Sequence, residues 1–187
     1  MNKLSSIVAA MVLTVTVSTA SENNIYAGGG LAIQSADSFD SGIALVLNGG
    51  MPIMPAGTVG PGTVAVEGEF TYSISDPEKR VRFLGRSFDA SISIMTLGAY
   101  AAYIYDINEQ FYVKPRAGII YRSYDADAGN FDAQDYEVYT NSDGEFGLSF
   151  GIGAGYRLSK EIDIYVDYTM IDGSDVTHLT AGAQYHF

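Results

Sequence analysis

The sequence lacks cysteine and is poor in basic residues, with ten lysines and arginines against 22 acidic residues. The absence of cysteine fits a compartment in which free thiols would be oxidised. The net charge of −12 and the isoelectric point near 4.3 argue against a nucleic-acid-binding protein, because nucleic acids bind to basic surfaces. The length of 187 residues allows one domain of ordinary size.

The sequence also lacks an apolar run that could form a membrane-spanning helix, which needs about 20 residues. Its N-terminus has instead a lysine, a shorter apolar run from Ile7 to Val17, and small residues up to Ala20. This order is typical of a secretory signal peptide. We therefore predict a signal peptide at residues 1–20, cleaved after Ala20, and an exported domain at residues 21–187.

Aromatic residues and glycine are abundant, with 14 tyrosines, nine phenylalanines and 21 glycines, and this composition favours strands over helices. The last eleven residues, Thr177 to Phe187, alternate between apolar side chains and polar or very small ones. A period of two is the pattern of a strand with two different faces. In a soluble domain such a terminal strand would be an unprotected edge, so the pattern favours a membrane β-barrel over an ordinary edge strand.

Seven further segments alternate in the same way, which predicts eight strands in all. We expect them at residues 24–34, 43–51, 63–74, 88–105, 111–122, 146–158, 162–170 and 177–187. The second half of 88–105 supports two registers, so we allow for a bulge there. Polar loops (35–42, 75–87, 123–145 and 171–176) should alternate with turns (52–62, 106–110 and 159–161). This alternation predicts an all-β, eight-stranded antiparallel up-and-down barrel.

The charged residues of the expected strands gather on one of the two faces. This face carries Glu67, Glu69, Lys114, Arg116, Arg157, Asp163 and Asp167, with Arg122 near one rim. The other face is almost uncharged, as a surface in contact with lipid must be, whereas a soluble lipocalin-like barrel would need the reverse. An eight-stranded barrel is only wide enough to be filled by side chains, and buried charges are tolerated only when paired. We therefore expect a lumen closed by a network of salt bridges.

Four segments taken together resemble a known family. They are YAGGGLA at 26–32, FYVKPRAGIIY at 111–121, FGIGAGYRL at 150–158 and AGAQYHF at 181–187. They are similar to the small eight-stranded outer-membrane barrels, the superfamily of the OmpA transmembrane domain, the OmpX-like proteins and the opacity proteins. The resemblance implies a place in the cell outer membrane, in contact with its lipid and lipopolysaccharide. It also implies that Leu179, Tyr185 and the terminal Phe187 are recognised by the barrel assembly machinery.

No motif in the sequence points to catalysis. The glycine-rich GIGAG at residues 151–155 lies inside an expected strand with no helix after it, so it is not a dinucleotide-binding loop. The two histidines, His178 and His186, face inward on the last strand without a serine-containing motif beside them. A lipid-processing enzyme needs a nucleophile with a histidine partner. We therefore expect no enzyme, and no cofactor or metal site.

The expected loop 123–145 is the longest and most acidic, but its spacing lacks the regular ligands and closing glutamate of an EF-hand, so we interpret it as solvated. Aromatic residues are interleaved with its acids: Tyr124, Phe131, Tyr136 and Tyr139. Exposed aromatic residues are common contact residues, and this loop is the candidate site for an extracellular partner.

Two functions remain open on the sequence alone. One is a structural or interaction protein that displays its loops at the cell surface, for example in adhesion. The other is a small porin-like channel for ions or small solutes. They differ in whether the charged residues close the lumen, and the pairing of those residues depends on the shear and tilt of the strands.

Overall fold

The computed structural model describes residues 25–36, 41–75, 78–83, 86–128, 144–171 and 176–187. The predicted signal peptide at residues 1–20 lies outside these ranges and stays a prediction. The described residues form β-strands and connecting turns. They contain no helix that is long and apolar enough to cross a membrane.

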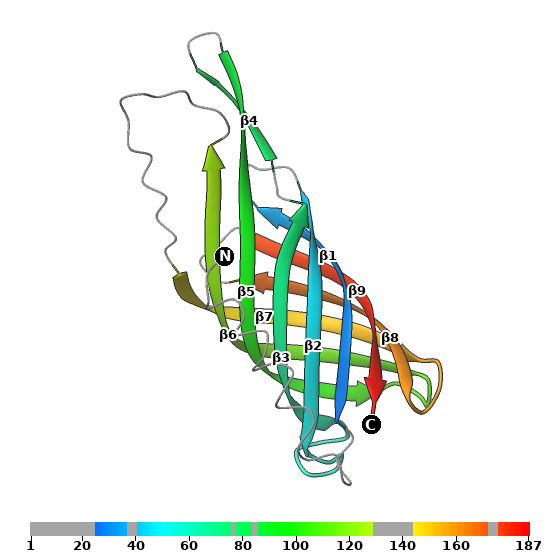
Figure 1. Ribbon diagram of the computed structural model, residues 1–187. Helices are drawn as coiled ribbons and strands as arrows, with labels where there is room; N and C mark the ends of the chain where they lie inside the picture. The colour runs from blue at the N-terminus through cyan, green and yellow to red at the C-terminus, as the bar shows by residue number, and fades with distance from the viewer. Residues whose placement is uncertain (1–24, 37–40, 76–77, 84–85, 129–143, 172–175) are drawn as a thin grey trace.

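Nine strands form one antiparallel sheet (Figure 1). They are β1 (Tyr26–Ala36), β2 (Gly42–Met54), β3 (Thr63–Ser75), β4 (Glu78–Phe83), β5 (Arg86–Asp106), β6 (Phe111–Ala128), β7 (Gly144–Arg157), β8 (Ile162–Ile171) and β9 (Val176–His186). The order in the sheet is β3-β2-β1-β9-β8-β7-β6-β5-β4, and β3 also pairs with β5. That pairing closes eight strands into a barrel, so the predicted up-and-down architecture is confirmed.

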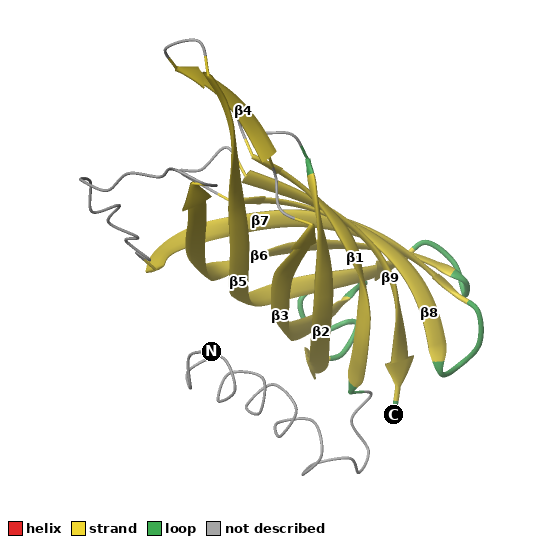
Figure 2. Ribbon diagram, turned by 45° about the horizontal axis from the view of Figure 1, so that its top comes forward, coloured by secondary structure: helices red, strands yellow, loops and turns green. Residues whose placement is uncertain are grey.

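The ninth strand, β4, corrects the expectation that residues 75–87 form a charged loop. β4 pairs with the beginning of β5, from Glu78 opposite Ser91 to Phe83 opposite Arg86. This β4–β5 hairpin extends beyond the barrel, away from the C-terminus (Figures 1 and 2). In the sequence, a strand of a membrane barrel is identified by one uncharged face that contacts lipid. A strand outside lipid does not need such a face, so the charges of this segment predict a loop instead.

Other boundaries also differ from the expected ones. β2 continues through Pro52, where its pairing with β3 shifts register, and a proline in a strand is normally confined to such an irregular or edge position. β5 keeps one register against β3 from Met95 to Ile104, so the bulge allowed for in this stretch is not found. β6 reaches Ala128 and β7 begins at Gly144, so both strands take residues from the expected loop 123–145.

The three turns after β2, β5 and β7 lie at the end of the barrel that also holds Ile25 and Phe187; we call it the turn end, and the opposite end the loop end. In the second turn, the Asn108 side chain accepts hydrogen bonds from the amides of Gln110 and Phe111 at 2.9 and 2.8 Å. Ser159 does the same for two amides in the third turn. Asn and Ser are favoured at such positions because their side chains bond to the backbone nearby.

The first turn, residues 55–62, has a different basis. Gly57 and Gly60 adopt positive φ angles of 92° and 142°, which side-chain-bearing residues rarely adopt. The Gly57 amide donates to the Gly60 carbonyl at 2.7 Å. The amide of Gly62 donates to the Tyr103 hydroxyl at 2.8 Å, which ties the turn to β5.

The outer wall of the barrel is apolar. Alternate residues of β8 show the pattern most clearly: Ile164, Val166, Tyr168 and Met170 are exposed, and the residues between them are buried. Aromatic pairs lie near both ends of the wall, Phe111 with Tyr156 toward the turn end and Tyr121 with Phe146 toward the loop end. Ten residues separate Phe111 from Tyr121, which at the usual rise and tilt gives a band about 25 Å tall, the height of a lipid-facing band.

Candidate functional site: the lumen

The centre of the lumen holds a group of five charged side chains from three strands, which we call the central cluster: Glu67 and Glu69 of β3, Lys114 and Arg116 of β6, and Asp167 of β8. They face inward because strand side chains alternate, and the intervening residues form the lipid-facing wall. The Lys114 ammonium lies 2.8 Å from Glu67 and 3.5 Å from Asp167. The Arg116 guanidinium lies 2.7 Å from Glu69, and its distances to the other two carboxylates are 3.6 and 3.7 Å.

Neutral side chains hold the central cluster in place. The Tyr26 hydroxyl donates a hydrogen bond to Glu67 at 2.5 Å. Arg116 donates to the Thr169 hydroxyl at 2.6 Å and lies over the Tyr100 ring, with 4.5 Å between the guanidinium carbon and the ring centroid. All five charged side chains are at most 4% exposed, so the cluster is sealed from solvent.

Glycines on β7 make room for these large groups. Gly153 lies directly opposite Asp167, and a Cβ on Gly153 would collide with the Asp167 carboxylate. Gly155 lies opposite Tyr112, and a Cβ there would collide with the tyrosine ring. Tyr112 and Tyr165 belong to this site as well, and their alternation with Lys114 and with Asp163 and Asp167 is the sequence signal that identifies them.

Two residues expected in the same network, Arg157 and Asp163, lie nearer the turn end. Arg157 pairs with Asp106 at 2.6 Å in a partly exposed site. Asp163 is buried and lies 2.9 Å from the His186 imidazole. The structure therefore divides the expected residues into the central cluster and two separate pairs.

Toward the loop end the inner face loses its charges. Gln34 accepts a hydrogen bond from Ser73 at 2.6 Å and lies 3.3 Å from His178. Beyond these residues Ile120, Ile171 and Val176 form one buried apolar cluster. Arg122 pairs with the exposed Glu145 at the rim, at 2.7 Å.

The central cluster can fill the lumen, but its positive and negative charges are not equal in number. Its three carboxylates face two cations, so full ionisation leaves one negative charge. Both Asp167 oxygens lack a hydrogen-bond partner among the described residues, although Oδ2 lies 3.5 Å from Lys114 and 3.7 Å from Arg116. In the described part of the chain no group of acidic, histidine or cysteine side chains could hold a metal ion.

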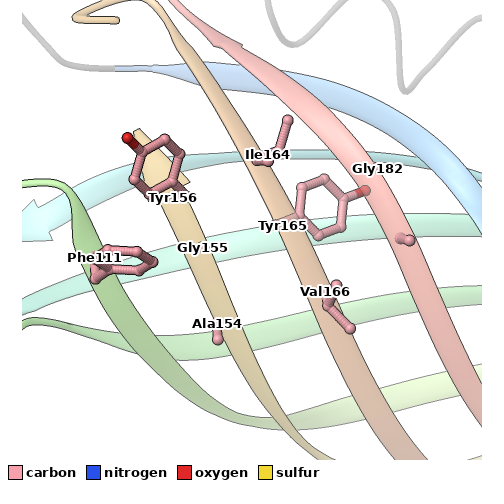
Figure 3. Close-up of a pocket in the computed structure, with 9 residues that line it drawn as sticks. Phe111, Ala154, Gly155, Tyr156, Ile164, Tyr165, Val166 and Gly182 are labelled. Carbon is pink, nitrogen blue, oxygen red and sulfur yellow. The ribbon is translucent and has the colours of Figure 1, made fainter. Parts of the chain in front are cut away.

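The outer wall carries a shallow hollow of about 370 Å³ over β7, β8 and β9 (Figure 3). Small or short side chains such as Ala154 and Val166 form its floor, and Phe111 and Tyr156 lie at one end. Its lining has no carboxylate, amine, imidazole or aliphatic hydroxyl group. Apart from its two tyrosines, Tyr156 and Tyr165, the hollow therefore offers only apolar contact.

The residues expected to guide barrel assembly lie on the outer wall. Leu179, Tyr185 and Phe187 are exposed on the outer face, and the rings of Tyr185 and Phe187 meet edge to face. Their role in assembly stays a prediction. Tyr124 belongs to β6, and Phe131, Tyr136 and Tyr139 lie outside the described residues.

A family model for the outer membrane protein beta-barrel domain matches residues 5–187. The chain belongs to this family. It is therefore a protein of the cell outer membrane, as its sequence resemblance implied. In such barrels the short turns face the periplasm and the longer loops face outward.

Solved structures show the same fold. Ail, the attachment invasion locus protein of Yersinia pestis, in complex with the heparin analogue sucrose octasulfate, is 15% identical with a TM-score of 0.53, covering 89% of this chain and 100% of its own. Neisserial surface protein A is 16% identical with a TM-score of 0.54, covering 89% and 98%. A major outer membrane protein from Thermus thermophilus is 16% identical with a TM-score of 0.55, covering 89% and 100%. No curated protein matches the sequence.

Proposed function

We propose that this protein is a closed outer-membrane barrel that displays its loop end for contact outside the cell, in a structural or adhesion role. The observation that carries the proposal is the central cluster, which fills the middle of the lumen with mutually paired side chains. The apolar side chains beyond it toward the loop end add a second obstruction. A barrel without a passage acts through its surfaces, and the loop end is the surface outside the cell.

The proposed contact role is also supported by the kinds of protein that share the fold. Ail is described as an attachment protein and the neisserial protein as a surface protein. For this barrel, the aromatic residues of the segment 123–145 are candidate contact residues, and the barrel wall contacts lipid and lipopolysaccharide. We further propose that residues 1–20 are the export signal and that Phe187 marks the last strand for the assembly machinery.

The absence of cysteine gives a direct test of surface display. A single cysteine at Ser87, in the β4–β5 hairpin, should react with a membrane-impermeant maleimide on intact cells. The matched variant Lys160→Cys, in the turn between β7 and β8, should react only after the outer membrane is opened. Reaction of the Lys160 variant but not the Ser87 variant on intact cells would reverse the proposed orientation. The contact role is then tested by deleting the protein and measuring cell adhesion, which should be lost.

A small channel is the second candidate function, and one observation favours it. The inner face is polar over most of its length, and Thr71 and Thr96 are buried without a hydrogen-bond partner for their hydroxyls among the described residues. A polar lining is what a water-filled passage needs. Steady ion conductance by the unaltered protein in a planar bilayer would establish this function in place of the closed barrel.

A further inference from the structure

The basic residues of this acidic protein are concentrated in one place at the loop end. Four of the ten lysines and arginines lie between residues 79 and 86: Lys79, Arg80, Arg82 and Arg86. Glu78 and Asp89 are the acids of the hairpin from Glu78 to Ser91, so its charge is 4 − 2 = +2 in a chain of −12. The hairpin is therefore positively charged although the chain as a whole is negatively charged.

The hairpin register arranges these residues in two pairs. Positions two apart on a strand share a face and are about 7 Å apart, so Arg80 and Arg82 lie on one face of β4. Lys79 occupies the other face, where Arg86 also lies because it is opposite Phe83. Each face of the hairpin therefore bears two basic positions.

The hairpin is placed where a molecule outside the cell would meet it. It projects past the closed part of the barrel (Figure 1), since β5 pairs with β4 up to Ser91 and with β3 only from Met95 onward. β4 pairs with no other strand among the described residues, so one backbone edge of the hairpin is unpaired.

The other basic residues of the exported domain are not available at the cell surface in the same way. Lys114 and Arg116 belong to the central cluster, and Arg122 pairs with Glu145. Arg157 and Lys160 lie at the turn end. Asp127 of β6 lies opposite Ser91 at the base of the hairpin, so an anionic molecule that approaches the loop end meets the concentrated positive charge farther along the hairpin, at residues 79–86.

We propose that the β4–β5 hairpin binds an anionic polysaccharide, a sugar chain that bears sulfate or phosphate groups. Guanidinium groups bind such tetrahedral anions through paired, charge-assisted hydrogen bonds. Short stretches rich in lysine and arginine form binding patches for heparin-like chains. The inference rests on the proposed surface display. The likeness to Ail shows the fold alone, so the ligand class follows from the hairpin's own charges.

Asp89 occupies the position opposite Arg80 in the hairpin register and adds a sharper expectation. A negative charge at this position lowers the local positive potential and opposes the approach of an anionic ligand. Replacing it with asparagine, Asp89→Asn, should tighten binding, whereas a hairpin that does not bind the ligand gives no such gain.

The test measures binding of a heparin octasaccharide to the refolded barrel in phosphatidylcholine nanodiscs, by calorimetry. Arg80→Gln with Arg82→Gln should weaken binding about tenfold or more and reduce its dependence on salt. The matched control is Arg157→Gln with Lys160→Gln, which removes two charges at the turn end and should leave binding within about twofold of the unaltered protein. Heat-modifiability on gels shows that each variant is a folded barrel.

A second arm distinguishes the source of the anionic sugar. If the partner is a neighbouring lipopolysaccharide, phosphatidylcholine vesicles that carry lipopolysaccharide with a phosphorylated core should bind the barrel through Arg80 and Arg82. If the partner is a free glycan, the octasaccharide should bind and these vesicles should not. Equal binding by the hairpin variant and the unaltered protein in both arms would overturn the proposal. If the barrel binds the octasaccharide but cells with the protein do not adhere, the contact role is contradicted and the binding site on the hairpin stands. If adhesion survives the double substitution, the binding site is contradicted and the contact role stands.

Discussion

Ion pairs occur in two different settings in this barrel, and the difference shows what the central cluster does. In the centre of the lumen, Lys114 and Glu67 are 1% and 4% exposed, and four of the five charged groups lie within 4 Å of more than one group of opposite charge. At the turn end, Arg157 and Asp106 are 31% and 56% exposed, and Arg157 also donates to the Glu109 carbonyl and lies over the Tyr112 ring. The two pairs have similar distances, so distance alone does not distinguish them.

Burial sets their energetic consequences apart. Exposed pairs contribute about 0–1 kcal/mol because water and salt screen them. A buried pair gains little over well-packed apolar groups, but removing one partner leaves a charge without compensation in a medium of low polarity. The central cluster is therefore better understood as a device that fills and closes the lumen than as a source of stability.

Loss of Arg116 should have the largest effect. Arg116→Ala leaves three carboxylates with Lys114 alone, and it opens space in the lumen. We expect the free energy of unfolding to fall by about 3–5 kcal/mol, measured by reversible urea unfolding in lipid vesicles. A loss below about 1 kcal/mol would show that water or ions already compensate the cluster.

Removing the Tyr26 hydroxyl should have the next largest effect. Tyr26→Phe keeps the ring but deletes the hydrogen bond to Glu67. Hydrogen bonds to charged groups contribute about 1.5–3 kcal/mol, so the same unfolding measurement should show a loss in that range. Tyr185→Phe, on the lipid-facing wall, is the matched control and should leave stability nearly unchanged.

A methyl group at Gly153 tests the packing of the cluster rather than its charge. Gly153→Ala places a Cβ against the Asp167 carboxylate, which must move away from Lys114 and Arg116. Overpacking of this kind costs about 1–3 kcal/mol. Gly68→Ala should be tolerated, because a Cβ on Gly68 has open space around it. Equal losses for the two variants would point to a backbone effect instead.

The smallest effect is expected at the exposed pair. Arg157→Gln removes the pairing with Asp106 but keeps much of the side chain, and it should cost no more than about 1 kcal/mol. High salt should reduce even this difference, because exposed charges are screened. A cost equal to that of Arg116→Ala would remove the distinction between the two settings.

The barrel itself could be predicted from the sequence because lipid imposes a simple rule on it. Residues such as Ile164 and Val166 must face lipid, and Asp163 and Asp167 on either side of them must not, so alternation locates the strands and their faces. The rule ends where the lipid ends. The strand Glu78–Phe83 has no uncharged face and is expected as a loop, and Ile94 points inward near the loop end although the inner face is expected to be polar.

The division of the charged residues could not be predicted for a different reason. Alternation places Arg157 and Asp167 on the same inner face, but it does not say at which height each one lies. The height depends on how far each strand is shifted against its neighbour around the closed barrel. In the structure that shift brings Glu67 beside Lys114, 47 residues away in the sequence, and leaves Arg157 at the rim.

Single-channel recording in a planar bilayer tests the closed lumen most directly, with the unaltered protein and Arg116→Ala compared side by side. We predict no conductance from the folded unaltered barrel and discrete channels from the variant, because loss of the guanidinium opens the centre of the lumen. Arg157→Gln should stay silent, since that residue lies outside the central cluster. Steady, ion-selective conductance by the unaltered protein would contradict the account and make this barrel a pore.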